Sequence, residues 1–174
     1  MLTDDHIGAA IARNVTALNR RDSLGRGTAV TTARAGANLT CRVTEGPWTI
    51  DVGMTEKYGG DGSAPNPGVF GRAALASCLA ISYAMWGSRL GVPLADVTVE
   101  VQADYDVRGE LGASDAIRPG YGQIRAIVTV ASDAPEDDVR RVVETADKYG
   151  SWLDNISNPV DVRRELRVAA PVRS

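Results

Sequence analysis

The longest apolar stretch of the chain runs from Ala73 to Trp86 and has almost no polar interruption. Because no narrow amphipathic stripe can be drawn on it, the pattern predicts a helix that is covered on most sides. Asn66 is placed to cap this helix, Pro67 suits its first position, and Gly91 follows its end. We therefore expect a long core helix that begins near Pro67.

Two further patterns precede this helix. Residues 4–21 carry apolar residues at helical spacing and predict an amino-terminal helix, in an extension that covers residues 1–24. Residues 25–43 are rich in Thr, Val and Ala, and after a turn at 45–47 apolar and polar residues alternate over 48–54. This alternation is typical of a half-buried strand, so we expect an antiparallel hairpin or meander.

Strand patterns dominate the second half. Residues 97–107 alternate perfectly between apolar and polar, and residues 124–130 predict the next strand after a surface loop at 109–120. A second helix is predicted from Pro135 to about Gly150. The alternation within 160–168 predicts a last strand, which three charged residues would restrict to a sheet edge.

The order of these elements indicates an α+β fold, because strands are grouped and do not alternate one for one with helices. The 174 residues, 24% of them charged, are expected to form one domain over 1–174. A net charge of −3 argues against a nucleic-acid or anionic-membrane partner. The apolar run of about 14 residues is shorter than the 18 to 20 or so of a bilayer crossing. Without a secretory signal at the start, we expect a cytoplasmic location.

Candidate chemistry is concentrated in two cysteines, Cys41 and Cys78. They are too few for a disulfide scaffold and lack the spacing of zinc ligands, so no metal site is expected. In a reducing compartment a cysteine is often only a small buried hydrophobic residue. The one histidine, His6, cannot form a His-based triad by itself.

The sequence Asn66-Pro67, ten intervening residues and then Cys78 in an alanine-rich helix resembles the OsmC/Ohr family of thiol-dependent organic hydroperoxide reductases. Gly91-Val92 and the alternating strand into Asp104-Tyr105-Asp106 extend the resemblance, which covers about residues 25–168. The resemblance implies an OsmC-like intertwined homodimer, with sheets wrapped around two long central helices and active sites at the subunit interface. It implies no cofactor.

The resemblance also implies a reaction. Cys78 would attack a peroxide oxygen and become a sulfenic acid, a second cysteine near the last helix would form a disulfide with it, and a dithiol would restore the pair. Because a thiol of pKa about 8.5 is only a few per cent ionised at neutral pH, such a cysteine needs a cation or hydrogen-bond donors beside it.

Two arginines are candidates for this cation. The family places its catalytic arginine where this chain has Arg34, at the end of an amino-terminal strand, and a guanidinium there would stabilise the thiolate and orient the peroxide. Arg34 could also be an ordinary solvated charge. Arg72 lies six residues before Cys78, about 240° around the helix, so we expect it to point away and to make a surface or interface pair.

Two positions depart from the family pattern. Gly68 stands where hydroperoxide reductases carry a glutamate, and Ser151 stands where they carry the second cysteine. Three alternatives remain. Cys78 acts alone and an external thiol reduces its sulfenic acid, or Cys41 is the resolving partner, or the peroxide chemistry is lost and a hydrophobic small molecule binds at the interface. The sequence favours a one-cysteine peroxidase for organic hydroperoxides, and the alternative is a catalytically degenerate binding dimer.

Overall fold

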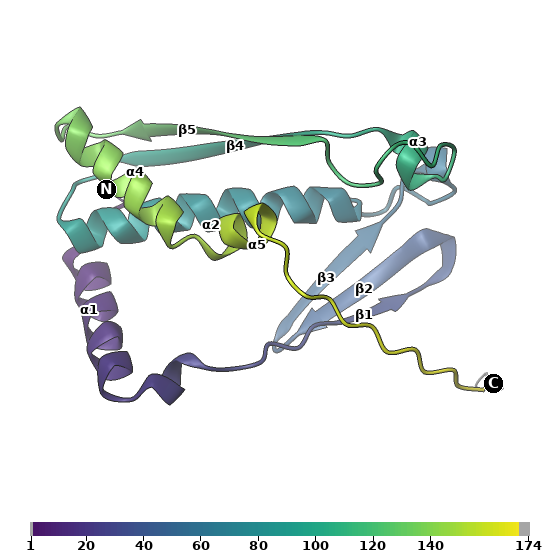
Figure 1. The fold of residues 1–174 in the computed structure, drawn as a ribbon, viewed down its shortest axis with the longest axis horizontal. Helices are drawn as coiled ribbons and strands as arrows, with labels where there is room; N and C mark the ends of the chain where they lie inside the picture. Colours follow the sequence, from purple (N-terminus) through teal and green to yellow (C-terminus); the bar gives the residue numbers. More distant parts are fainter. Residues whose placement is uncertain (1, 171–174) are drawn as a thin grey trace.

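The computed structural model describes residues 2–170, which form a three-stranded sheet, a two-stranded sheet and a long central helix with smaller helices around it (Figure 1). The helices are α1 (Asp5–Arg20), α2 (Pro67–Leu90), α3 (Val107–Glu110), α4 (Glu136–Lys148) and α5 (Ser151–Ser157). The strands are β1 (Thr32–Ala35), β2 (Thr40–Glu45), β3 (Trp48–Gly53), β4 (Asp96–Asp104) and β5 (Gln123–Ala131). All strand pairs are antiparallel, and the α+β fold is confirmed.

Helix α2 begins and ends at the predicted residues. The Asn66 side chain accepts a hydrogen bond from the Val69 N–H at 3.3 Å, and Pro67 lies in the first turn. Gly91 ends the helix in the left-handed conformation, with φ of 68°, and its N–H donates to the Gly87 carbonyl. Glycine adopts this conformation without the steric cost that a Cβ brings. The caps therefore explain both boundaries.

The sequence suggested that the apolar segment of α2 is too short to cross a membrane, and this expectation is corrected. With 24 residues it is long and apolar enough, by length and composition alone, to cross a membrane, although the uninterrupted apolar run suggested a shorter segment. In the structure, β4, α4 and α5 pack against α2 (Figure 1). This is the packing expected of the core helix of a layered domain.

The core lies where α2 meets the β4–β5 sheet and α4. Leu75, Leu79 and Tyr83 are buried on one side of α2 and pack with Ala146 of α4. The Tyr83 hydroxyl also donates a hydrogen bond of 2.8 Å to the Asp147 carboxylate. Burial and this neighbouring carboxylate both raise the pKa of Tyr83 far above its usual value. The bond ties the end of α4 to the middle of α2.

The predicted amino-terminal helix is present as α1, which packs near the end of α2. The segment before it is attached by backbone and side-chain bonds, because the Leu2 N–H donates to the Leu94 carbonyl at 2.9 Å and the Leu94 N–H donates to the Thr3 hydroxyl at 3.0 Å. The two helices approach closely at Gly8, where a Cβ would lie 2.8 Å from the Ser88 carbonyl oxygen.

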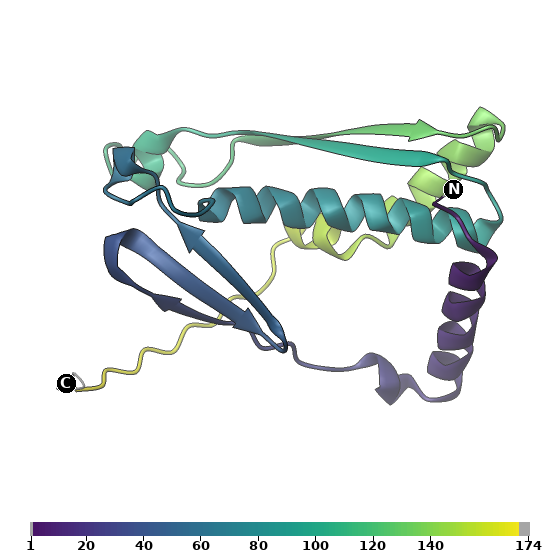
Figure 2. The same ribbon diagram turned by 180° about the vertical axis from the view of Figure 1, so that it is seen from behind.

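The three-stranded sheet has the order β1-β2-β3 and stands apart from the middle of α2 in both views (Figures 1 and 2). No other element of the described chain packs extensively against it. Large apolar side chains are exposed on this sheet, Trp48 at 73% for example, and also on α2, where Ile81 is 63% exposed. One chain therefore leaves part of its apolar surface uncovered.

Three elements differ from the sequence prediction. The predicted last strand at 160–168 is wrong: this segment is irregular and exposed, because no strand within residues 2–170 pairs with it. The strand predicted to reach Val107 ends at Asp104, because Asp106 caps α3 by accepting a hydrogen bond from the Arg108 N–H. The helix predicted to run from Pro135 to Gly150 ends at Lys148, and α5 follows it directly.

Replacing Tyr83 by Phe should lower the free energy of unfolding by about 1 to 3 kcal/mol, because the half-buried Asp147 carboxylate loses its donor. Urea denaturation at one protein concentration measures this change. Tyr105→Phe is the matched control, since Tyr105 is 67% exposed and its hydroxyl makes no hydrogen bond within residues 2–170. An equal decrease in the free energy of unfolding of the two variants would contradict the stabilising role of the Tyr83–Asp147 hydrogen bond.

Candidate functional site

Cys78 lies in the middle of α2 and is half-buried. Its Sγ atom is 3.8 Å from the Oγ atom of Ser151, the first residue of α5. Ser151 reaches this place because α4 is tied to α2 through Asp147, and only two residues lie between Asp147 and Gly150 at the start of α5. The fold thus brings together two side chains that are 73 residues apart in the sequence.

The chemistry of this pair differs from that of two cysteines. A serine hydroxyl can donate a hydrogen bond to a thiolate or to the oxygen of a sulfenate, and it cannot form a disulfide. Cys41 and Cys78 are both free thiols in the structure. No group of three or more metal-ligating side chains occurs within residues 2–170.

Arg34 and Cys41 lie in the three-stranded sheet. Arg34 of β1 is opposite Arg42 of β2, and Cys41 is opposite Ala35. Arg34 and Cys41 both line a cavity of about 440 Å³, and Cys78 does not line it. Arg42 is paired with Asp51 at 2.9 Å, whereas Arg34 forms no ion pair with any described residue. Within one chain, the candidate cation and the candidate nucleophile are therefore on separate parts of the fold.

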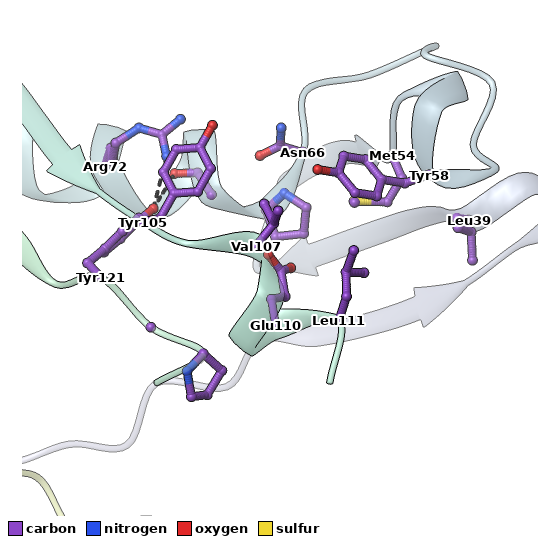
Figure 3. A pocket seen from close by; sticks show the side chains of 14 residues that line it. Leu39, Met54, Tyr58, Asn66, Arg72, Tyr105, Val107, Glu110, Leu111 and Tyr121 are labelled. Atoms are coloured by element: carbon purple, nitrogen blue, oxygen red, sulfur yellow. Dashed lines mark hydrogen bonds between the residues drawn. The ribbon is translucent and has the colours of Figure 1, made fainter. Parts of the chain in front are cut away.

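Gly68 and Arg72 form a second cluster at the start of α2. Arg72 Nη1 donates a hydrogen bond of 2.9 Å to the Tyr121 hydroxyl, which donates in turn to the Gly68 carbonyl at 3.4 Å (Figure 3). A Cβ at Gly68 would lie 3.2 Å from Arg72 Nη1 and 3.4 Å from the Tyr121 hydroxyl. A side chain at residue 68 would therefore crowd the guanidinium, which would have to shift by a few tenths of an ångström.

This cluster corrects the expectation for Arg72. The sequence suggested a surface or interface pair, but the side chain is half-buried and bonds Tyr121 of its own chain. Helical geometry indicates only that Arg72 does not face Cys78. Tyr121 is 49 residues away in the sequence, so no local pattern could have identified it.

Two cavities meet at the Arg72–Tyr121 pair. The α2–α3 cavity has a volume of about 510 Å³ and lies between the start of α2 and the segment around α3 (Figure 3). The α2–α5 cavity has a volume of about 580 Å³, and its lining residues come from α2, the β4–β5 hairpin and α5. They are Gly71, Arg72, Leu75, Val101, Arg118, Tyr121, Gly122, Gln123, Ile124, Trp152 and Ile156.

The lining of the α2–α5 cavity includes sequence neighbours of the Cys78–Ser151 pair, but neither Cys78 nor Ser151 itself. Leu75 is one helical turn before Cys78, and Trp152 directly follows Ser151. The cavity is thus a candidate small-molecule site that the thiol itself does not line. Sequence reasoning missed it because α5, which supplies one wall, was not predicted.

A sequence profile described as OsmC-like protein matches residues 60–165, which contain α2, Cys78 and Ser151. The chain belongs to the OsmC-like family. Solved structures with the same fold include an OsmC-like protein from Mycoplasma pneumoniae, 10% identical with a TM-score of 0.66, over 76% of this chain and 89% of that one. No curated protein matches the chain.

Two further structural relatives of this OsmC-like chain are organic hydroperoxide resistance proteins. The one from Legionella pneumophila is 20% identical, with a TM-score of 0.57 over 79% of this chain and 94% of that one. The one from Elizabethkingia anophelis is 13% identical, with a TM-score of 0.58 over 77% and 91%. At these identities the similarity supports the shared fold.

Ser151→Cys should create a disulfide with Cys78 under mild oxidation, because the two side-chain atoms are already 3.8 Å apart and a disulfide needs closely spaced Cβ atoms. Intact mass in a Cys41→Ser background would show the loss of two hydrogens. Ser157→Cys, at the far end of α5, is the control and should remain reduced. Failure of Ser151→Cys to pair would contradict the observed placement of α5.

Proposed function

We propose that this OsmC-like protein is a thiol-dependent peroxidase that reduces organic hydroperoxides through Cys78. The observation that carries the proposal is the half-buried Cys78 beside Ser151 on the central helix of an OsmC-like chain. The structural relatives described as organic hydroperoxide resistance proteins support the substrate class.

The reaction needs one cysteine and an external thiol. The Cys78 thiolate attacks the terminal peroxide oxygen, the O–O bond breaks, and the alkoxide takes a proton and leaves as an alcohol. The resulting sulfenic acid reacts with an external thiol to give a mixed disulfide and water. A second thiol then releases Cys78 and leaves as part of a disulfide. The proposal assigns the protein to the reducing cytoplasm, where such thiols are available.

The role of Ser151 follows from its position. In the neutral pair either group can donate across the 3.8 Å contact. A thiolate can only accept, so during the reaction the Ser151 hydroxyl would donate to the Cys78 sulfur. It does not trap the sulfenic acid in a disulfide, so the cycle depends on the external thiol arriving before further peroxide. Over-oxidation to the sulfinic acid is the competing reaction.

Arg34 is proposed to activate Cys78 in a homodimer, supplied by the partner chain. Two observations support this arrangement. The sheet that carries Arg34 stands apart from α2 of its own chain (Figures 1 and 2). Apolar side chains on α2 and on that sheet, such as Ile81 and Trp48, are also exposed in one chain and would be buried at a subunit interface. A second copy that places its sheet against α2 would meet both requirements.

The second candidate function is a catalytically degenerate dimer that binds a hydrophobic small molecule. It is favoured by the α2–α3 and α2–α5 cavities, whose volumes of about 510 and 580 Å³ lie in the range of small-molecule sites. Gly68 and Ser151 also depart from the residues that the family's two-cysteine reaction uses.

Intact mass after one equivalent of organic hydroperoxide, with a sulfenic-acid trap present, tests the chemistry. We expect one trapped adduct on Cys78 and none in Cys78→Ser. Arg34→Met should slow adduct formation about 100-fold, as loss of one stabilising donor does, while Arg26→Met should leave the rate unchanged. Loss of two hydrogens would indicate a Cys41–Cys78 disulfide. An unchanged mass would reject the peroxidase and favour the binding function.

Light scattering after size exclusion tests the homodimer. The wild type should have twice the 18.4 kDa mass of one chain, and Ile81→Glu should shift it to the monomer mass, because a charge would be buried at the interface. Ile127→Glu, at a similarly exposed residue of β5, should remain dimeric. A monomeric wild type would exclude the supply of Arg34 by a partner.

A further inference from the structure

We infer that the α2–α5 cavity binds an amphipathic carboxylate, with the carboxylate on Arg72 and the apolar body along the side chains of α5 and the β4–β5 hairpin. The inference concerns binding alone. It goes beyond the proposed peroxidase function and does not depend on the reactivity of Cys78.

The charge of the cavity lining indicates an anionic ligand. Arg72 and Arg118 contribute to this lining, and no carboxylate does. The other two cavities each contain an acidic side chain, Glu110 in the α2–α3 cavity and Asp51 in the cavity of the three-stranded sheet. Arg34 and Arg42 outnumber Asp51 in the cavity of the three-stranded sheet, so the α2–α5 cavity is distinguished by a lining with two arginines and no carboxylate.

Arg72 is oriented for such a ligand. Its guanidinium is half-buried, so water screens its charge less than that of an exposed side chain. One Nη1 donor is used by the Tyr121 hydroxyl, which holds the planar group in place. Arg72 forms no ion pair within residues 2–170. The remaining N–H donors match the two oxygens of a carboxylate.

The rest of the cavity suits an apolar body. Leu75, Val101, Ile124, Trp152 and Ile156 line it and offer hydrocarbon and indole surface. Its volume of about 580 Å³ accommodates a medium-length alkyl or aryl group. Neither Cys78 nor Ser151 lines this cavity, so the ligand is not expected to contact the thiol. Along the helix axis, Arg72 and Cys78 are about 9 Å apart, at 1.5 Å per residue.

Calorimetric titration of the Cys78→Ser protein with decanoate, and separately with 1-decanol, tests the inference. We expect saturable binding of decanoate that is at least about 10-fold tighter than that of 1-decanol, because a charged hydrogen bond is lost with the alcohol. Arg72→Met should abolish this preference and leave 1-decanol binding unchanged. Trp152→Ala should weaken both ligands.

The control is Arg13→Met, which removes an exposed arginine of α1 and should bind decanoate like the parent protein. Melting curves of each variant exclude a folding defect as the cause of lost binding. Equal affinity for the two ligands, binding of neither, or full decanoate affinity in Arg72→Met would each overturn the inference. Because the titrations use Cys78→Ser, these outcomes leave the peroxidase proposal to its own test.

Discussion

The structure depends on a helix that is apolar on all sides while one chain covers it on only part of its surface. Leu75, Leu79 and Tyr83 are buried against the β4–β5 sheet and α4, whereas Ile81 on the same helix remains exposed. A helix of this composition is stable in water only when its apolar residues are covered. This requirement explains why the β4–β5 sheet and the carboxyl-terminal helices pack around α2. It also favours burial of the exposed side of α2 against a second copy of the chain.

The candidate nucleophile owes its surroundings to this packing. The half-buried hydrogen bond from Tyr83 to Asp147 fixes the end of α4, and the short connection through Gly150 then starts α5 beside Cys78. Ser151, and Trp152 in the lining of the α2–α5 cavity, are therefore positioned by a contact that lies outside that cavity. Loss of the Tyr83–Asp147 hydrogen bond would therefore alter the surroundings of Cys78 although neither residue contacts the thiol.

The start of α2 shows how one missing side chain changes the chemistry of a site. With no Cβ at Gly68 to crowd it, the Arg72 guanidinium lies beside the start of α2 and donates a hydrogen bond to Tyr121. A carboxylate at residue 68 would place a negative charge beside this arginine. Its absence leaves the positive charge available to the cavities that meet there. The electrostatic character of this region thus differs from that of a site built on an arginine–glutamate pair.

The sequence by itself determined the local elements: the limits of α2 from Asn66, Pro67 and Gly91, the hairpins from their alternation, and α1 and α4 from their helical spacing. These signals are local, because a cap or a period involves neighbours within a few residues. Only the tertiary structure decided the Cys78–Ser151 contact, the Arg72–Tyr121 bond and the irregular segment at 160–168. The first two join residues 73 and 49 positions apart, and a strand forms only where another strand is available to pair with it.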